Sequence, residues 1–187
     1  MHPSLFYRPG ALLSQPELSA ARIDGLLVEV GEGYMPADLP EDAAARATSL
    51  SPILVPGFAV CGPSAAWVQG AGDAPPSRHH LQRVSERRPR VTSADHVVIH
   101  ERRIDSAEVM LIDGIAVTTP VRTLTDLVLG GGRDPETDRW MRCLASAVPE
   151  LLPVVRRLIA ARTRMPGKRA ALKRIDDLQQ PQEDVTR

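Results

Sequence analysis

Four of the five histidines lie in two close pairs, and imidazole is a frequent metal ligand and general base. His79 and His80 are adjacent, while His96 and His100 bracket the β-like segment "HVVIH". In an extended strand adjacent side chains point to opposite faces, and four residues span about 13 Å. Neither pair can therefore hold one metal ion by itself, and the sequence predicts no metal site.

The acids between residues 105 and 126 are the other candidates for chemistry. Their spacing does not require any two of them to meet, and Asp113 is explained by the turn that Asp113-Gly114 predicts. The chain has no GxSxG motif, and neither Cys61 nor Cys143 lies beside a histidine or in a CxxC motif. We therefore expect a protein that is not an enzyme and that needs no cofactor.

The segment "IAVTTPVRTLTDLVLGGG", Ile115 to Gly132, is the most strongly patterned part of the chain. It begins as a β-like run, and then Thr119 and Pro120 have the residue types of a helix N-cap and first helical position. A phosphate-binding loop of the GxxxxGK[ST] type needs its glycines before the helix, followed by a lysine. Here the glycines follow the helical pattern and no lysine comes next. The segment is therefore interpreted as a strand-to-helix junction.

One segment is strongly basic in a chain whose formal net charge is zero. Residues 154–174 contain eight basic residues and no acid, whereas residues 1–50 contain three arginines and seven acids. Interleaved apolar residues let the charges project from helices, where they either contact phosphates or stay solvated. Aromatic residues are only 3% of the chain, which argues against a single-strand stacking surface, so we expect duplex DNA. The basic candidates are Arg156, Arg157, Arg162, Arg164, Lys168, Arg169, Lys173 and Arg174.

Length and composition indicate an ordinary globular protein. Its 187 residues are 43% hydrophobic and 25% charged, and no apolar run approaches the roughly 20 residues that cross a bilayer. The first residues lack the basic start, long apolar core and cleavage site of an export signal. We expect a cytoplasmic location and no membrane partner, and the sequence does not predict the oligomeric state.

The first fifty residues predict a helix, a hairpin and a second helix. Ser14 and Glu17 have capping-box spacing before a short helix, and residues 26–35 are typical of a small hairpin. Another helix is expected from about Glu41 to Leu50, and the prolines at 52 and 56 mark a boundary. Helix followed by hairpin is the outline of a winged helix.

The remainder predicts a mixed α/β domain with C-terminal helices. A short helix carries Trp67 and stops at Gly70, strands follow within residues 91–102, and a hairpin turns at Asp113-Gly114. Further helices are expected over residues 134–148, 150–163 and 168–180, the middle one broken near Pro153. The predicted fold class is therefore α+β, with a winged-helix-like domain at 1–50, an α+β domain at 51–175 and a frayed tail at 176–187.

The segments "CGPSAAWVQGAG" and "DGIAVTTPVRTLTDL" resemble the AbiEi-like antitoxin family of type IV toxin–antitoxin systems, particularly its divergent actinobacterial members. The resemblance is densest from Phe58 to Leu127. In that family a helix ending in a tryptophan or leucine and a glycine, here with Trp67, precedes strands and a V-T-[ST]-P-x-R-T-x-x-D-L segment. That segment is matched by Val117, Thr118, Thr119, Pro120, Arg122, Thr123, Asp126 and Leu127. The motif is non-catalytic, and we expect Arg122 and Asp126, one helical turn apart, to tie the helix to its neighbours.

The resemblance also implies a winged-helix DNA-binding domain at residues 6–35, with "GLLVEVGEGYM" as its wing. The segment "LSAARID" is what remains of a recognition helix. For contact with phosphates it has one basic residue, Arg22, and one acid, Asp24. Family wings usually carry arginines where this chain has Glu29, Gly31 and Glu32. Acids facing phosphates are repulsive, so this domain is also a candidate protein-contact module.

Members of the family bind operator DNA and counter a nucleotidyltransferase toxin, so the leading hypothesis is a non-enzymatic, antitoxin-like transcriptional regulator. Many actinobacterial relatives continue into a nuclease domain, whereas this sequence ends at Arg187, and we expect the regulatory part alone. Two other hypotheses stay open. One is a stand-alone protein-interaction module that has lost DNA binding, and the other is an accessory subunit of a nucleic-acid enzyme.

Overall fold

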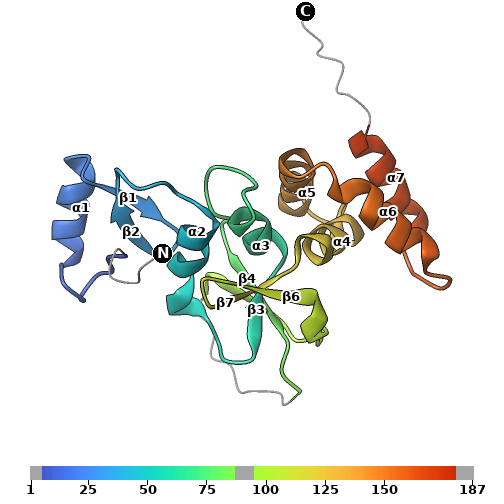
Figure 1. Cartoon of the computed structure of the whole chain (residues 1–187), viewed down its shortest axis with the longest axis horizontal. Coiled ribbons are helices and arrows are strands. Elements are labelled where there is room, and N and C mark those ends of the chain that lie inside the picture. The colour runs from blue at the N-terminus through green and yellow to red at the C-terminus, as the bar shows by residue number, and fades with distance from the viewer. Residues whose placement is uncertain (1–5, 87–94, 180–187) are drawn as a thin grey trace, which may run out of the picture.

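The computed structural model describes residues 6–86 and 95–179. They form an α+β structure with one two-stranded and one five-stranded sheet, which confirms the predicted fold class. Helix α1 lies at one end of the molecule and α6 and α7 lie at the opposite end (Figure 1). None of the described helices is long and apolar enough to cross a membrane.

Residues 6–36, called the N-terminal unit below, contain one helix and one hairpin. The elements are α1 (Gln15–Ile23), β1 (Leu27–Val30) and β2 (Gly33–Pro36). The predicted capping box is present, because the backbone N–H of Ser14 donates to the Glu17 carboxylate at 2.7 Å. The two strands pair antiparallel, as the sequence predicts. A small separate core is formed by Leu18, Leu27 and Tyr34.

The hairpin turn packs against the rest of the protein. Helix α2 (Ala43–Ser49) follows the hairpin, and its N-cap is Asp42, whose carboxylate accepts the Ala45 N–H at 2.8 Å. Gly31 in the turn has a φ of +53°, and a Cβ there would overlap the Ser49 hydroxyl and lie 3.2 Å from the Trp67 ring. The turn therefore has no room for a side chain at position 31. The domain boundary at residue 50 stays a prediction.

The larger sheet has the strand order β5-β4-β3-β7-β6. Strands β3 and β7 and strands β4 and β5 pair parallel, whereas β3 with β4 and β6 with β7 pair antiparallel. The sequence predicted β5 and the β6–β7 hairpin and missed β3 and β4. The strands are β3 (Phe58–Val60), β4 (His79–Arg83), β5 (Val97–His100), β6 (Val109–Ile112) and β7 (Ile115–Thr118). Residues 91–94 of the predicted strand region lie outside the described residues.

Trp67 is completely buried at the centre of the main core. It lies on α3 (Gly62–Val68), a helix that packs against α2, α4, α5 and β4. Its carbonyl accepts a hydrogen bond from Arg46 of α2 at 2.8 Å, and the Arg46 guanidinium lies 5.3 Å from the centroid of its ring. Helix α3 therefore connects the N-terminal part of the chain to the sheet and to the C-terminal helices.

The segment from Ile115 to Gly132 is a strand-to-helix junction, as predicted. Strand β7 ends at Thr118, and the hydroxyl of the N-cap Thr119 accepts the Arg122 N–H at 3.3 Å. Pro120 is the first residue of α4 (Pro120–Gly130), where its missing N–H has no intrahelical partner to lose. The buried apolar face of α4 includes Leu124, Leu127 and Val128.

Three helices complete the described chain: α5 (Pro135–Ala147), α6 (Leu151–Ala161) and α7 (Lys168–Gln179). The predicted break near Pro153 is wrong, since α6 is continuous. Pro153 is its third residue, where the backbone N–H would have no intrahelical acceptor. Residues 176–179, which the sequence assigns to a tail, belong to α7, and residues 180–187 lie outside the described residues.

We predict that Gly31→Ala destabilises the protein more than Gly25→Ala does. Both glycines have positive φ, so each substitution strains the backbone by about 1–2 kcal/mol. A Cβ at position 25 meets nothing within 4 Å, whereas a Cβ at position 31 overlaps Ser49. Urea unfolding of both variants measures the difference in the free energy of unfolding. Equal losses would contradict the close packing of the hairpin turn.

Candidate functional site

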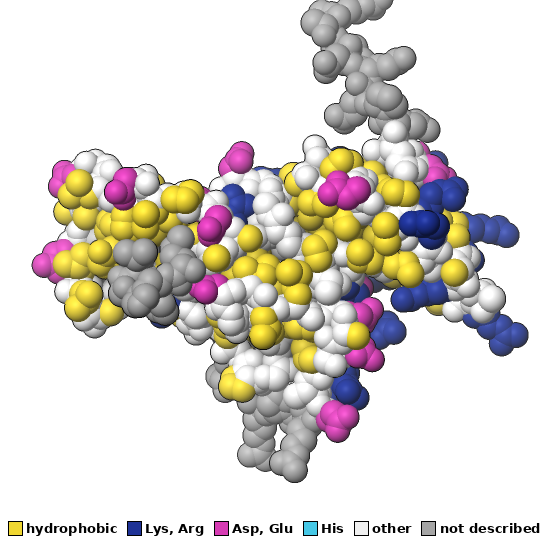
Figure 2. All heavy atoms as spheres, viewed as in Figure 1, with side chains coloured by type: hydrophobic (Ala, Val, Ile, Leu, Met, Phe, Trp, Pro, Cys, Tyr) yellow, Lys and Arg dark blue, Asp and Glu magenta, His cyan; other side chains and the backbone are white. Residues whose placement is uncertain are grey.

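The eight basic residues of segment 154–174 are called the basic face below. They lie on α6, on α7 and on the residues between these helices. Figure 2 shows lysine and arginine side chains gathered at this end of the molecule. The face is therefore built from two packed helices, which fix the spacing of charges that are distant in sequence.

Two residues of the basic face are partly committed to contacts inside the protein. The Nε of Arg156 donates to Asp176 at 2.8 Å, and both side chains are 47% exposed. The Nζ of Lys168 donates to the carbonyls of Ala160 and Arg162 at 2.6 and 2.7 Å, where α6 ends. Lys168 therefore satisfies a helix C-terminus, and its charge is less available to an external ligand.

Arg174 faces inward and has a structural role. It donates to the Val128 carbonyl at 3.1 Å and packs against Gly131 and Gly132 at the end of α4. It also lines an open groove of about 880 Å³ between α5, α6 and α7, with Met141 and Leu152 among the apolar lining residues. Arg174 therefore belongs to this groove more than to the exposed part of the basic face.

The other five basic residues are exposed on the surface. Among the described residues, none of these five takes part in an ion pair. They are Arg157, Arg162, Arg164, Arg169 and Lys173. Exposed cations without a local counter-charge can form phosphate contacts without first breaking an internal salt bridge.

The N-terminal unit presents a different charge pattern. Arg22 is exposed in the last turn of α1, at the end of the molecule opposite the basic face (Figure 1). Glu32, in the hairpin turn, points at the larger sheet, where its Oε1 lies 3.2 Å from the Nε2 of His79 and 3.4 Å from that of His96. Glu29 is exposed on β1. The acid in the turn thus forms an internal contact with His79 of β4 and with His96, which directly precedes β5.

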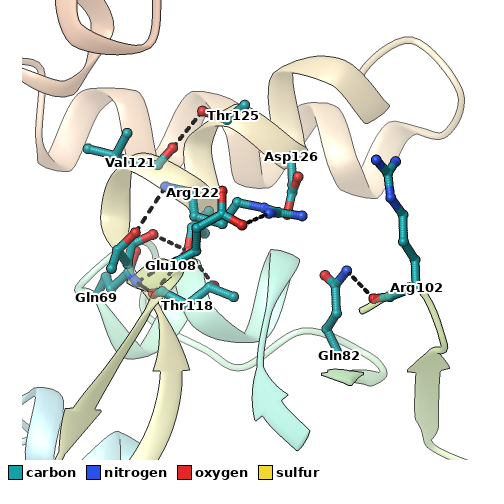
Figure 3. A network of polar contacts seen from close by, with 11 residues as sticks. Gln69, Gln82, Arg102, Glu108, Thr118, Val121, Arg122, Thr125 and Asp126 are labelled. Carbon is teal, nitrogen blue, oxygen red and sulfur yellow. Dashed lines mark hydrogen bonds and ion pairs between the residues drawn. The ribbon is translucent and has the colours of Figure 1, made fainter. Parts of the chain in front are cut away.

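Arg122 joins carboxylates from two different elements (Figure 3). Its Nε donates to Asp126, one turn along α4, at 2.6 Å, and its Nη1 pairs with Glu108, which directly precedes β6. The Arg122 side chain is 16% exposed, whereas the Glu108 and Asp126 side chains are 35% and 31% exposed, so both pairs are partly buried. This is the tie between α4 and its neighbours that the sequence predicts.

Burial changes the acidity of two groups near Arg122. Burial raises the pKa of Asp126, and the hydrogen bond and charge of Arg122 act against that rise. Burial also raises the pKa of the Cys61 thiol, so this thiol stays protonated and unreactive at neutral pH. Cys61 and Cys143 are both free.

The histidines meet across strands in a way that the sequence did not predict. His79 and His80 face opposite sides of β4, as expected for adjacent residues in a strand. His79 lies beside His96, with ring centroids 6.5 Å apart, and the Nδ1 of His80 lies 3.1 Å from the Nε2 of His100. The prediction missed these pairs because β4 was not recognised as the parallel neighbour of β5. Within residues 6–86 and 95–179 no group of three or more His, Cys, Asp or Glu is arranged to hold a metal ion.

Comparison with known proteins identifies a family and a remote similarity to a solved structure. Residues 58–174 match the family model for the AbiEi antitoxin C-terminal domain. No curated protein matches the chain. The crystal structure of the RV2827C protein from Mycobacterium tuberculosis is 18% identical, with a TM-score of 0.44. That match covers 87% of this chain and 63% of the other, so the chain spans less than two thirds of that protein.

We predict that Arg122→Met lowers the free energy of unfolding by about 1–3 kcal/mol, because it leaves two partly buried carboxylates without a cation. The triple variant Arg122→Met, Glu108→Gln, Asp126→Asn also removes the carboxylate charges and should regain most of that stability. Urea unfolding of both variants tests this. A triple variant as unstable as the single one would assign the cost to the missing packing of the arginine stem.

Proposed function

This chain belongs to the AbiEi antitoxin C-terminal domain family, and on that basis we propose a non-enzymatic, antitoxin-like transcriptional regulator that binds duplex DNA through the basic face. Its operator DNA is contacted by α6, α7 and the residues between them. The proposed site of action is the cytoplasm. Family membership supports the antitoxin-like role in general, and the DNA contact rests on the charges described above.

The observation that carries the DNA proposal is the group of five exposed cations without ion pairs among the described residues. Phosphate contacts by lysine and arginine supply most of the affinity for duplex DNA, because each contact releases condensed counterions. Arginine also forms bidentate hydrogen bonds with phosphate oxygens, and four of these five residues are arginines. The basic face therefore has the chemistry of a backbone-binding surface.

The hairpin of the N-terminal unit is less suited to reading DNA. Gly31 is enclosed by Ser49 and Trp67, and the Glu32 carboxylate lies against the imidazoles of His79 and His96, so neither residue of the turn can be presented to a phosphate. Glu29, which is exposed, would face the phosphates with a negative charge. We therefore assign DNA contact to the opposite end of the molecule.

A protein contact through the N-terminal unit is the second candidate function, and a specific observation favours it. Four large hydrophobic side chains are exposed within residues 12–28, with Leu12 and Ile23 at 83% and 80%. Figure 2 shows hydrophobic side chains gathered over this part of the molecule. The other two are Leu26 and Val28. Exposed apolar groups that gather in one region are typical of protein interfaces, and a nucleotidyltransferase toxin is the partner that we propose.

The DNA proposal is tested with the variant Arg157→Ala, Arg164→Ala, Arg169→Ala. Fluorescence-anisotropy titrations use the duplex upstream of the gene and a scrambled duplex, at several salt concentrations. We expect weaker binding and a log–log salt dependence that is flatter by about 0.9 for each phosphate that the variant no longer neutralises. An affinity and slope equal to those of the unaltered protein would rule out this surface.

The matched control removes the same charge elsewhere, with Arg78→Ala, Arg102→Ala, Arg133→Ala, since these arginines are also exposed. It should leave the affinity much closer to that of the unaltered protein. An equal weakening in the control would assign the effect to net charge. A second control, Ile23→Ser with Leu26→Ser, alters the exposed apolar group and should not change DNA affinity.

A further inference from the structure

Two histidines from neighbouring strands present their ring nitrogens to each other on one face of the larger sheet. His80 lies on β4 and His100 on β5, in parallel strands where His100 is the register partner of Gln82. The Nδ1 of His80 and the Nε2 of His100 are 3.1 Å apart. Two nitrogens that each bind one tetrahedral zinc at 2.0–2.1 Å lie about 3.3 Å from each other. The observed spacing is therefore close to that of two ligands of one metal ion.

A hydrogen bond to the neighbouring helix fixes the backbone at His80. The β4 N–H of His80 donates to the Ser64 hydroxyl on α3 at 2.9 Å, which ties the strand to the helix next to it. The rings are tilted by 37°, with centroids 5.2 Å apart, so the two nitrogens face each other without stacked rings. The register of β4 and β5, rather than the spacing of the histidines in the sequence, thus brings the two ring nitrogens close together.

Carboxylates and one arginine lie close enough to act electrostatically on the two rings. Neutral imidazole is the form that binds metals. The carboxylates of Glu136 and Asp134 act on His80 and that of Asp126 acts on His100, while Arg78 is the cation near His80.

We propose that His80 and His100 form a two-histidine site for a divalent transition metal ion, with zinc as the representative case. Imidazole nitrogen suits zinc, copper and nickel better than magnesium or calcium. Because no third protein ligand is arranged there among the described residues, water completes the coordination shell and binding is reversible. The ion would join β5, an edge strand of the sheet, to β4.

The other histidine pair provides an internal control. His79 lies on β4 and His96 directly precedes β5, and both Nε2 atoms lie near the Glu32 Oε1, at 3.2 and 3.4 Å. His79 is buried in the core and its Nδ1 lies 3.4 Å from the Ser64 hydroxyl. This pair is committed to the contact between hairpin turn and sheet, and we assign it no metal.

The test is titration of the full chain, freed of metal with a chelator, with zinc chloride. Long-range proton–nitrogen NMR of the imidazoles is the specific measurement. We expect zinc to shift the Nδ1 resonance of His80 and the Nε2 resonance of His100 and to leave those of His79 and His96 unchanged. Isothermal titration should give one equivalent at micromolar affinity. Unshifted resonances would leave a hydrogen bond between the two rings as their only interaction and would overturn the proposal.

The variants His100→Asn and His96→Asn form the matched pair, because both positions are exposed. His100→Asn should lose the zinc signal in calorimetry, and His96→Asn should retain it. If His96→Asn loses zinc binding while His100→Asn retains it, the assignment of the site to this face of the sheet is overturned. A folded His100→Asn protein, verified by its circular dichroism, that binds zinc like the unaltered chain would overturn it as well.

Discussion

Trp67 is enclosed by groups from distant parts of the chain: Gly31 of the hairpin turn, Arg46 of α2 and His79 of β4. A side chain of this size is stable in a core only when every side of its ring has a packing partner. The hairpin, α2 and the sheet must therefore all be in place for α3 to be buried. The N-terminal unit is anchored to the main core through this contact.

The N-terminal unit and the basic face lie at opposite ends of the molecule and differ in surface chemistry. The hairpin turn is used to enclose Trp67, and its acid Glu32 is used to contact His79. The exposed cations are at the other end, on α6 and α7 (Figure 2). The formal net charge is zero, and residues 154–174 concentrate eight basic residues at this end of the molecule. The proposed division between DNA contact and protein contact follows from this separation.

The junction between β7 and α4 shows how far local sequence reasoning reaches. Thr119 and Pro120 affect residues no more than three positions away in the sequence. The helix cap and the first helical residue could therefore be predicted from the residue types alone. Arg122 and Asp126 are likewise one helical turn apart. Glu108, the second partner of Arg122, lies on the far side of the β6–β7 hairpin, and only the folded hairpin brings it close.

By itself the sequence determined the α+β class, most helices, both hairpins and the segment that carries the cations, because these depend on contacts between near neighbours. It also marked the family motif from Val117 to Leu127. Tertiary structure alone decided that "HHLQR" is a strand, since a polar segment becomes β4 only by pairing with β3 on one side and β5 on the other. The same pairing decided which histidines meet, and helix packing decided which cations stay exposed. Such outcomes depend on strand register and helix packing, which no single stretch of sequence encodes.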